Sequence, residues 1–213
     1  MKLEVKDLLP DYFEQERKTT SEIWGKELSF SNGDLVNIVA PSGTGKTSLT
    51  HFLYKMRESY TGTILYDGKN LKNCSKEDIA ALRKDHVSII LQDMRLFEEQ
   101  TLLENLEIKR QLNPYHPQER IIEMARALGI DHRLNALAKN CSYGEQQRSV
   151  IIRALLQPFD ILLMDEPVSH LDDSNSRKAI GLILEEAFKR NAAVIFAELE
   201  RAAYFPATQL YHL

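Results

Sequence analysis

Cysteine is scarce in this chain of 213 residues, and long apolar runs are absent. Only Cys74 and Cys141 occur, which is too few for a disulfide framework and predicts a reducing compartment. No apolar run is long enough to cross a bilayer, and the first residues alternate charged and apolar side chains, unlike a signal peptide. The sequence therefore predicts a cytosolic protein that sits on a membrane only through a partner.

Charge of one sign is not in large excess either. The chain has 27 Lys and Arg against 31 Asp and Glu, for a net charge of −4. This balance gives no global electrostatic reason to expect a nucleic-acid partner, and we expect none. A hydrophobic content of 43% and a charged content of 27% are typical of a globular domain. The length suits one domain, or one domain with a subdomain.

A glycine-containing loop organises the rest of the chain. Residues 34–39 predict a strand before it, and apolar residues at helical spacing follow it. Gly43 and Gly45 let backbone N–H groups approach phosphate oxygens, and a helix N-terminus adds further donors. We therefore predict a phosphate-binding P-loop, in which Lys46 reaches the β- and γ-phosphates and Thr47 ligates Mg²⁺. The loop residues are Ala40, Pro41, Ser42, Gly43, Thr44, Gly45, Lys46, Thr47 and Ser48.

Ala40 stands where the usual P-loop pattern has its first glycine, so a small Cβ lies where none is expected. A glycine-rich turn without a ligand is the alternative interpretation. The Gly-Lys-Thr sequence between a strand and a helix strongly favours nucleotide binding.

Two acids follow the apolar strand predicted at residues 161–164. In a P-loop protein, Asp165 at the end of this strand is placed to hold Mg²⁺ through water. Glu166 is placed to polarise the attacking water. A plain strand-ending turn is the alternative, and the presence of a P-loop in the same chain makes it the weaker one.

A second anion-binding helix end is predicted at Ser142. Ser142 and Glu145 have the spacing of a capping box, so a helix should begin at about Tyr143. Its N-terminus offers N–H groups, the Ser142 hydroxyl and Gly144. The alternative is a helix whose cap is purely structural. The position of this helix shortly before Asp165 and Glu166 favours an anion-binding N-terminus.

The order of elements predicts an α/β fold whose parallel sheet is covered on both faces. Between Gln92 and the strand at residue 161 the sequence shows helical patterns and no convincing strand, which predicts a helical insert. The other expected strands are an edge strand from Leu3 to Leu8, short strands at 23–24 and 28–30, a hairpin at 61–69 with Asp67-Gly68 as its turn, and a strand at 193–196. The expected helices are a P-loop helix that ends near Glu58, helices that begin after Ser75 and Thr101, a helix that begins at Pro117, and a helix at about 174–190.

Together these motifs resemble those of the ATP-binding subunits of ABC (ATP-binding cassette) transporters, over nearly the whole chain. Residues 40–47 resemble the family's Walker A motif, and Gln92 its Q-loop. Residues 141–145 are similar to its signature, and residues 161–165 to its Walker B motif, followed by Glu166 as the catalytic base. Residues 169–172 resemble its D-loop.

This resemblance implies a fold and a division of the chain. The fold is that of a RecA-like P-loop NTPase, with a mainly parallel sheet, an antiparallel β subdomain and a helical insert subdomain. Residues 1–213 form one ABC ATPase domain. Within it, residues 1–92 and 160–213 make the nucleotide-binding core with its β subdomain, and residues 93–159 make the helical signature subdomain.

The resemblance also implies the ligands ATP and Mg²⁺ and the roles of individual residues. The expected catalytic residues are Glu166, Lys46 and Gln92. The expected Mg²⁺ ligands are Thr47, Gln92 and Asp165. Beyond the P-loop, the expected nucleotide contacts are Tyr12 or Phe13 on the adenine, with Ser142, Gly144 and Glu145 at the signature.

Partners follow from the same resemblance. Two cassettes of this family dimerise head to tail, so Ser142 and Gly144 would act on the nucleotide of a partner cassette, in a homodimer or a heterodimer. A permease on a separate chain would dock near residues 93–115 and hold the protein on the inner face of the cell membrane. Within the family, the chain looks most like the lipoprotein-release, macrolide-export and cell-division subgroup. The alternative function is a cassette that signals through ATP-dependent dimerisation in a cell-division type of complex, with little transport.

The chain departs from the family pattern at two places. The switch histidine that follows the strand after Walker B is missing, and Ala197 or Glu198 stands in its place. This predicts either slow hydrolysis or a heterodimer whose partner completes the better site. In the signature, Cys141, Tyr143 and Glu145 replace the residues usual in the family, which predicts a modified cross-dimer site.

Overall fold

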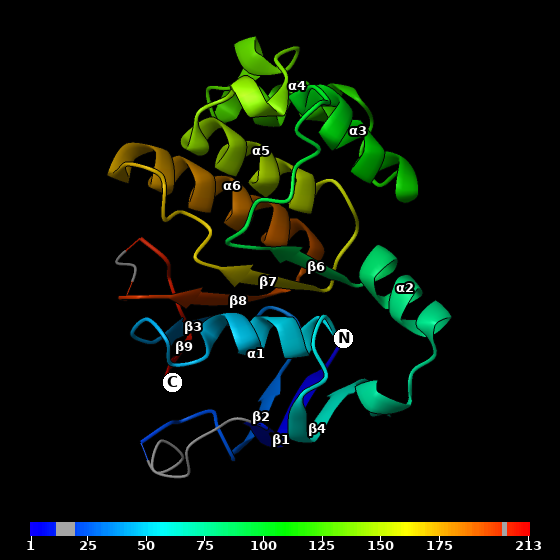
Figure 1. Cartoon of the computed structure of the whole chain (residues 1–213), viewed down its shortest axis with the longest axis vertical. Helices are drawn as coiled ribbons and strands as arrows, with labels where there is room; N and C mark the ends of the chain where they lie inside the picture. The colour runs from blue at the N-terminus through cyan, green and yellow to red at the C-terminus, as the bar shows by residue number, and fades with distance from the viewer. Residues whose placement is uncertain (12–19, 202–203) are drawn as a thin grey trace.

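A computed structural model describes residues 1–11, 20–201 and 204–213 of the chain. The elements stack in layers, with a parallel sheet in the middle, a group of helices on one face, and helix α1 with a second sheet on the other (Figure 1). Tyr12 and Phe13, predicted to stack on adenine, lie outside the described residues, so this assignment stays a prediction.

The central sheet has five strands in the order β6-β7-β8-β3-β9, and every neighbouring pair is parallel. This arrangement confirms the predicted parallel sheet. The last strand, β9, was not expected from the sequence. The strands are β3 (Leu35–Val39), β6 (Val87–Ile90), β7 (Ile161–Asp165), β8 (Ala193–Glu198) and β9 (Gln209–His212).

Alternate residues of the central strands enter two different cores. On β7, Leu162 and Met164 pack into the cluster formed with helices α4 to α6. Ile161 and Leu163 on the same strand pack into the cluster that contains α1 and the second sheet. Burial on both faces explains why this strand is a continuous apolar run rather than an alternating one.

The second sheet is antiparallel, in the order β2-β1-β4-β5. The prediction that the first strand lies at an edge was wrong, because Leu3 pairs with Phe30 on one side and with Tyr66 on the other. The predicted hairpin is confirmed, with positive φ at both turn residues, Asp67 and Gly68. The strands are β1 (Leu3–Pro10), β2 (Glu27–Phe30), β4 (Tyr60–Tyr66) and β5 (Lys69–Asn70).

The short strand expected at residues 23–24 is a turn instead. The hydroxyl of Ser21 accepts hydrogen bonds from the backbone N–H groups of Ile23 (3.1 Å) and Trp24 (2.8 Å). These local bonds take the donors that a sheet would need. The apolar pair is buried, but its backbone does not form the predicted strand.

The three predicted capping boxes are all present, at Ser75, Thr101 and Ser142. The P-loop helix ends at Leu53 rather than near Glu58, and Lys55 just beyond it has a positive φ of 60°. The prediction that a helix begins at Pro117 was wrong by two residues, because the helix begins at Glu119. The helices are α1 (Lys46–Leu53), α2 (Lys76–Asp85), α3 (Leu102–Leu112), α4 (Glu119–Ala127), α5 (Tyr143–Leu155) and α6 (Asp173–Arg190).

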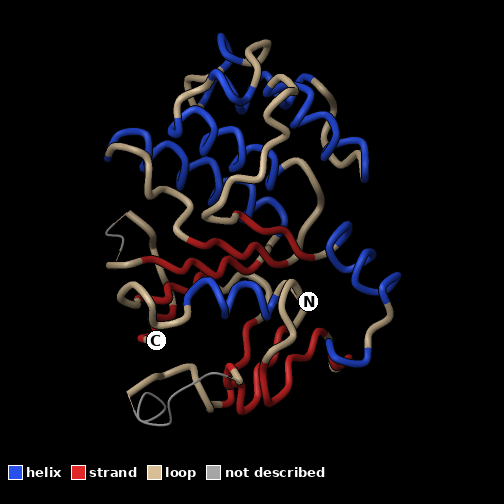
Figure 2. The backbone as a smooth tube through the Cα atoms, viewed as in Figure 1, coloured by secondary structure: helices blue, strands red, loops and turns tan. Residues whose placement is uncertain are grey.

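Helices α3, α4 and α5 form the insert between β6 and β7, and they gather at one end of the molecule (Figures 1 and 2). The strands lie together at the middle and the opposite end. Within the described ranges, none of the helices is both long and apolar enough to cross a membrane.

Candidate functional site

The P-loop joins β3 to α1, whose first residue is Lys46. Gly43 and Gly45 have positive φ angles of 79° and 110°, which side chains other than glycine rarely adopt. A Cβ on Gly45 would also lie 3.0 Å from a ring carbon of Trp24. Ala40 is fully buried and is not among the residues with positive φ, so the backbone accepts alanine there without strain.

Trp24 is a residue of the P-loop surroundings that sequence reasoning missed. It is 1% exposed, and its ring nitrogen donates to the carbonyl oxygen of Thr44 at 3.4 Å. Its ring also packs edge-on against Phe52 of α1. The one available signal was that Trp24 is the sole tryptophan of the chain. Trp24 lies between β1 and β2, so a residue from the antiparallel sheet region packs under the P-loop.

Of the three predicted catalytic residues, Glu166 contacts both of the others. Lys46 Nζ donates to the carbonyl oxygens of Ala40 (2.7 Å) and Pro41 (3.1 Å) and lies 3.5 Å from Glu166 Oε1. Gln92 Nε2 donates to Glu166 Oε2 at 3.3 Å. The lysine therefore lies folded back against its own loop, where an incoming phosphate can replace the carbonyl oxygens as its partner.

Asp165 is fully buried at the end of β7. Within the described part of the chain, neither of its carboxylate oxygens has a hydrogen-bond partner of good geometry. Burial raises the pKa of Asp165, while the nearby Thr47 hydroxyl acts to lower that pKa. A buried carboxylate without a partner is costly unless a cation accompanies it, so Asp165 and Thr47 fit a hard cation such as Mg²⁺.

Glu166 has a strained backbone that its neighbours hold in place. Its φ is 47°, which is uncommon for a residue other than glycine. Its N–H donates to the carbonyl oxygen of Ala197 on β8 (3.0 Å), and its carbonyl accepts from Gln147 Nε2 on α5 (3.3 Å). The side chain is thereby aimed at Lys46 and Gln92.

The structure separates the two positions considered for the missing switch histidine. Ala197 is fully buried in the core cluster around α1. Glu198 is half-buried at the end of β8, and its Oε2 has no hydrogen-bond partner in the described chain. Burial, aided by the charge of nearby Glu166, raises the pKa of Glu198 to about 7. A carboxyl group therefore borders Glu166 where the family has an imidazole.

The signature residues lie on the N-terminus of α5, apart from the P-loop. Ser142 Oγ accepts from the N–H of Glu145 (3.3 Å), and Glu145 Oε2 accepts from the N–H of Ser142 (2.8 Å). A Cβ on Gly144 would lie 3.3 Å from the carbonyl oxygen of His170. Within the described ranges, these residues make no hydrogen bond or ion pair with the P-loop, so the predicted signature and the P-loop are separate in one chain.

The central parallel sheet, the glycine loop at the start of α1 and the acids at the end of β7 define a P-loop nucleotide-binding protein. The comparisons with known proteins narrow this class. The family model described as ABC transporter matches residues 25–169, which is more than half of the chain. The chain belongs to the ABC transporter family, as an ATP-binding subunit and an ATPase of the ABC type.

Two relatives agree with this assignment, and a solved structure shares the fold. The lipoprotein-releasing system ATP-binding protein LolD of Gluconobacter oxydans is 31% identical over 188 residues, or 87% of this chain and 81% of the relative. The cell division ATP-binding protein FtsE of Streptococcus pneumoniae is 29% identical over 85% of this chain and 78% of its own. The dimeric structure of MJ0796, a bacterial ABC transporter cassette, superposes with a TM-score of 0.80 at 22% identity, covering 93% of this chain and 88% of that one.

Proposed function

We propose that this subunit binds ATP with Mg²⁺ between two cassettes, and that hydrolysis there drives a permease on a separate chain. The observation that carries the proposal is the separation of two sets of residues: within the described residues, Ser142 and Glu145 bond each other, and neither Ser142 nor Gly144 has a hydrogen bond or ion pair to the P-loop. A second cassette, identical or different, brings its signature to this P-loop. Residues 93–159 act as the helical subdomain that carries the signature.

Each residue of the P-loop half has a role that follows from its position. The N–H groups of residues 40–48 surround the phosphates, and Lys46 exchanges the carbonyl oxygens of Ala40 and Pro41 for phosphate oxygens. Thr47, Gln92 and Asp165 would hold Mg²⁺, which neutralises charge on the phosphates. Glu166 orients the attacking water and accepts its proton.

A mixing experiment tests the cross-dimer site. The variant Lys46→Met loses the P-loop half, and the variant Ser142→Arg loses the signature half. Each homodimer then contains no complete site. A mixed dimer contains one complete site, made by the P-loop of the second variant and the signature of the first. We expect each variant alone to be nearly inactive, and the mixture to recover up to about a quarter of the wild-type turnover per chain.

The readout is phosphate release at fixed total protein. Mixing Lys46→Met with the double variant Lys46→Met/Ser142→Arg is the matched control, because no pairing of these chains makes a complete site. Full activity of Ser142→Arg alone, or no recovery on mixing when a mixed dimer is detected, would contradict the proposal. Recovery in the control mixture would show that the assay measures something else.

We also propose that Glu198 slows hydrolysis, because its carboxylate repels the γ-phosphate and the Glu166 charge beside it. Glu198→His should raise ATP turnover by roughly tenfold, and Glu198→Gln should mainly tighten ATP binding. Steady-state turnover and equilibrium binding of a fluorescent ATP analogue measure the two effects. Unchanged values in both variants would rule out Glu198 as the limiting group, and a partner cassette with its own histidine would then be the better explanation.

The kind of membrane partner is inferred from the names of two relatives. The names of LolD and FtsE refer to a lipoprotein-releasing system and to cell division, so we propose a membrane partner that holds this subunit at the inner face of the cell membrane. Co-purification followed by an ATPase assay of the intact complex tests this. A partner with many membrane spans supports transport, and a small division protein supports the signalling alternative.

A further inference from the structure

Arg133 lies beside the signature residues at the N-terminus of α5. It ends a short 3₁₀ helix, Asp131–Arg133, between α4 and α5. Its neighbours Ile130 and Leu134 are buried in the core cluster formed with α4 to α6, which anchors the backbone that carries Arg133. The side chain is 31% exposed and lies against Glu145. Arg133 therefore reaches the first turn of α5 from a fixed base.

The guanidinium of Arg133 contacts the signature at two points. Its Nε lies 3.1 Å from Glu145 Oε1, in an ion pair. Its Nη2 donates to the carbonyl oxygen of Asn140 at 2.7 Å and, more weakly, to Cys141 Sγ at 3.9 Å. Asn140 and Cys141 directly precede Ser142, the N-cap of α5. These contacts direct the guanidinium toward its own chain, which suits a residue that acts through the signature rather than on a nucleotide.

Glu145 is an ionised carboxylate inside the first turn of α5. Its Oε2 accepts from the N–H of Ser142 at 2.8 Å, and its Oε1 faces Arg133. Burial acts to raise the pKa of Glu145, but hydrogen bonding with Ser142 and the nearby charge of Arg133 outweigh it, so the pKa is lowered. A carboxylate at this place opposes the positive end of the helix dipole and repels an approaching phosphate. The charge of Arg133 offsets this effect.

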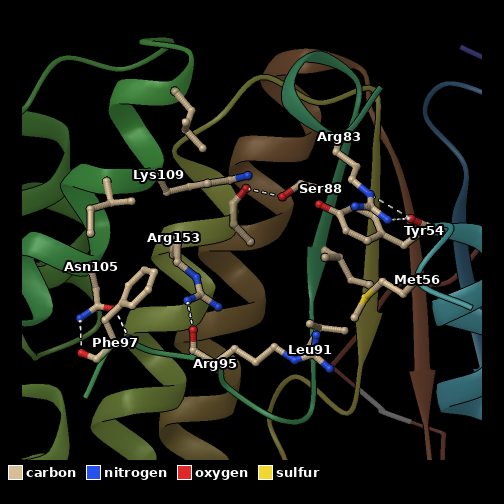
Figure 3. Close-up of a pocket in the computed structure, with 14 residues that line it drawn as sticks. Tyr54, Met56, Arg83, Ser88, Leu91, Arg95, Phe97, Asn105, Lys109 and Arg153 are labelled. Atoms are coloured by element: carbon tan, nitrogen blue, oxygen red, sulfur yellow. Dashed lines mark hydrogen bonds between the residues drawn. The ribbon is translucent and has the colours of Figure 1, made fainter. Parts of the chain in front are cut away.

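The C-terminal half of α5 is held by hydrogen bonds of its own. Arg153, in the last turn, donates to the carbonyl oxygens of Met94 and Arg95 at 2.7 Å (Figure 3). Ser88 of β6 donates to the carbonyl oxygen of Ala154, also at 2.7 Å. Loss of the ion pair at the first turn should therefore change the local charge without moving the helix.

We propose that Arg133 is a positioning residue of the ATPase, which pairs with Glu145 so that the signature end of α5 accepts the γ-phosphate of the nucleotide on the partner cassette. This inference rests on the proposed function and adds a residue to it. The main contribution is electrostatic, because the guanidinium offsets the carboxylate that the capping box places at the helix end. The bond to Asn140 fixes the chain before Ser142 and is the smaller contribution.

The test measures the effect of Arg133→Met in two backgrounds, the wild type and Glu145→Gln. Glutamine keeps a capping box but carries no charge. In the wild-type background we expect about a tenfold loss of ATP turnover, because the uncompensated carboxylate repels the nucleotide, and the loss should shrink at high salt. In the Glu145→Gln background the same substitution should cost less than about twofold. Binding of a fluorescent ATP analogue to the P-loop of the same chain should not change.

Two further variants complete this test. Lys69→Met is the matched control, because Lys69 pairs with Asp78, the capping-box acid of α2, at 2.8 Å; turnover should not change. Arg133→Lys keeps the charge and should keep most of the turnover, so it tests the inference even where Arg133→Met does not fold. Equal losses in the two backgrounds, or a full loss in Arg133→Lys, would overturn the inference, because the arginine would then act through its bonds to the loop alone.

The mixing experiment shows on which chain Arg133 acts. In the dimer of Lys46→Met with Ser142→Arg, the Lys46→Met chain supplies the signature of the complete site. Adding Arg133→Met to that chain should lower the recovered turnover about tenfold, and adding it to the Ser142→Arg chain should not. If the parent mixture recovers turnover and the placement of Arg133→Met makes no difference, the inference fails and the proposed function stands. If the parent mixture does not recover, the proposed function fails, and this inference fails with it.

Discussion

Replacing Glu166 with glutamine should lower the turnover of ATP by about 10²–10³-fold while leaving ATP binding nearly unchanged. Glutamine has the same shape and keeps hydrogen-bonding atoms near Lys46 and Gln92, which contact Glu166 in the ligand-free protein. It cannot accept a proton from water. The positive φ of 47° at this position is equally unfavourable for both residues, so the backbone should not change.

The measurements are phosphate release for turnover and equilibrium titration with a fluorescent ATP analogue for affinity. Glu27→Gln, an exposed site on β2, is the matched control and should match the wild type in both. Equal turnover of Glu166→Gln and the wild-type protein would exclude Glu166 as the general base. A large loss of ATP affinity would instead indicate that the charge of Glu166 positions Lys46 before nucleotide arrives.

Residue patterns that act locally could be predicted from the sequence. The capping boxes at Ser75, Thr101 and Ser142 each form within four consecutive residues, so no tertiary information is needed to find them. The strand–loop–helix of the P-loop is local in the same sense. The residues proposed to carry phosphate chemistry are therefore predictable from the sequence without the fold.

Features that depend on distant segments could not be predicted in this way. The support of Thr44 by Trp24 joins residues 20 positions apart, and the interior position of β1 depends on pairing with β4, which lies over 50 residues later. The short strand β9 alternates half-buried and exposed residues and has no fully buried one, and it pairs with β3 at the edge of the central sheet. Its sequence alone carries no signal for that edge.

Within the candidate site, the choice between Ala197 and Glu198 also depends on distant segments and could not be made from the sequence. The sequence allowed either residue in place of the switch histidine. Parallel pairing of β8 with β3 and β7 places Ala197 opposite Ile38 and Asp165 and turns its side chain into the core. Because successive residues of a strand face opposite sides, this register leaves Glu198 as the residue beside Glu166.

Replacing Lys46 with methionine should weaken ATP binding by about 10²–10³-fold, because the phosphates lose a charged donor at the helix N-terminus. Methionine keeps the apolar part of the side chain, which is buried against the loop. Lys178→Met on the exposed face of α6 is the matched control. An unchanged dissociation constant for ATP would contradict the assignment of residues 40–48 as the phosphate site.

The variant Lys46→Met also separates the contribution of Lys46 to ATP binding from its contribution to the stability of the fold. In the ligand-free protein it bonds the carbonyl oxygens of Ala40 and Pro41 and pairs with buried Glu166. Losing these partners should lower the free energy of unfolding by about 1–3 kcal/mol. The double variant Lys46→Met/Glu166→Gln removes the unpaired charge, so it should regain part of this stability in denaturant titrations while ATP binding stays weak. Recovery of both properties would mean that Lys46 acts by neutralising Glu166, and recovery of neither would mean that its bonds to the loop carbonyls dominate.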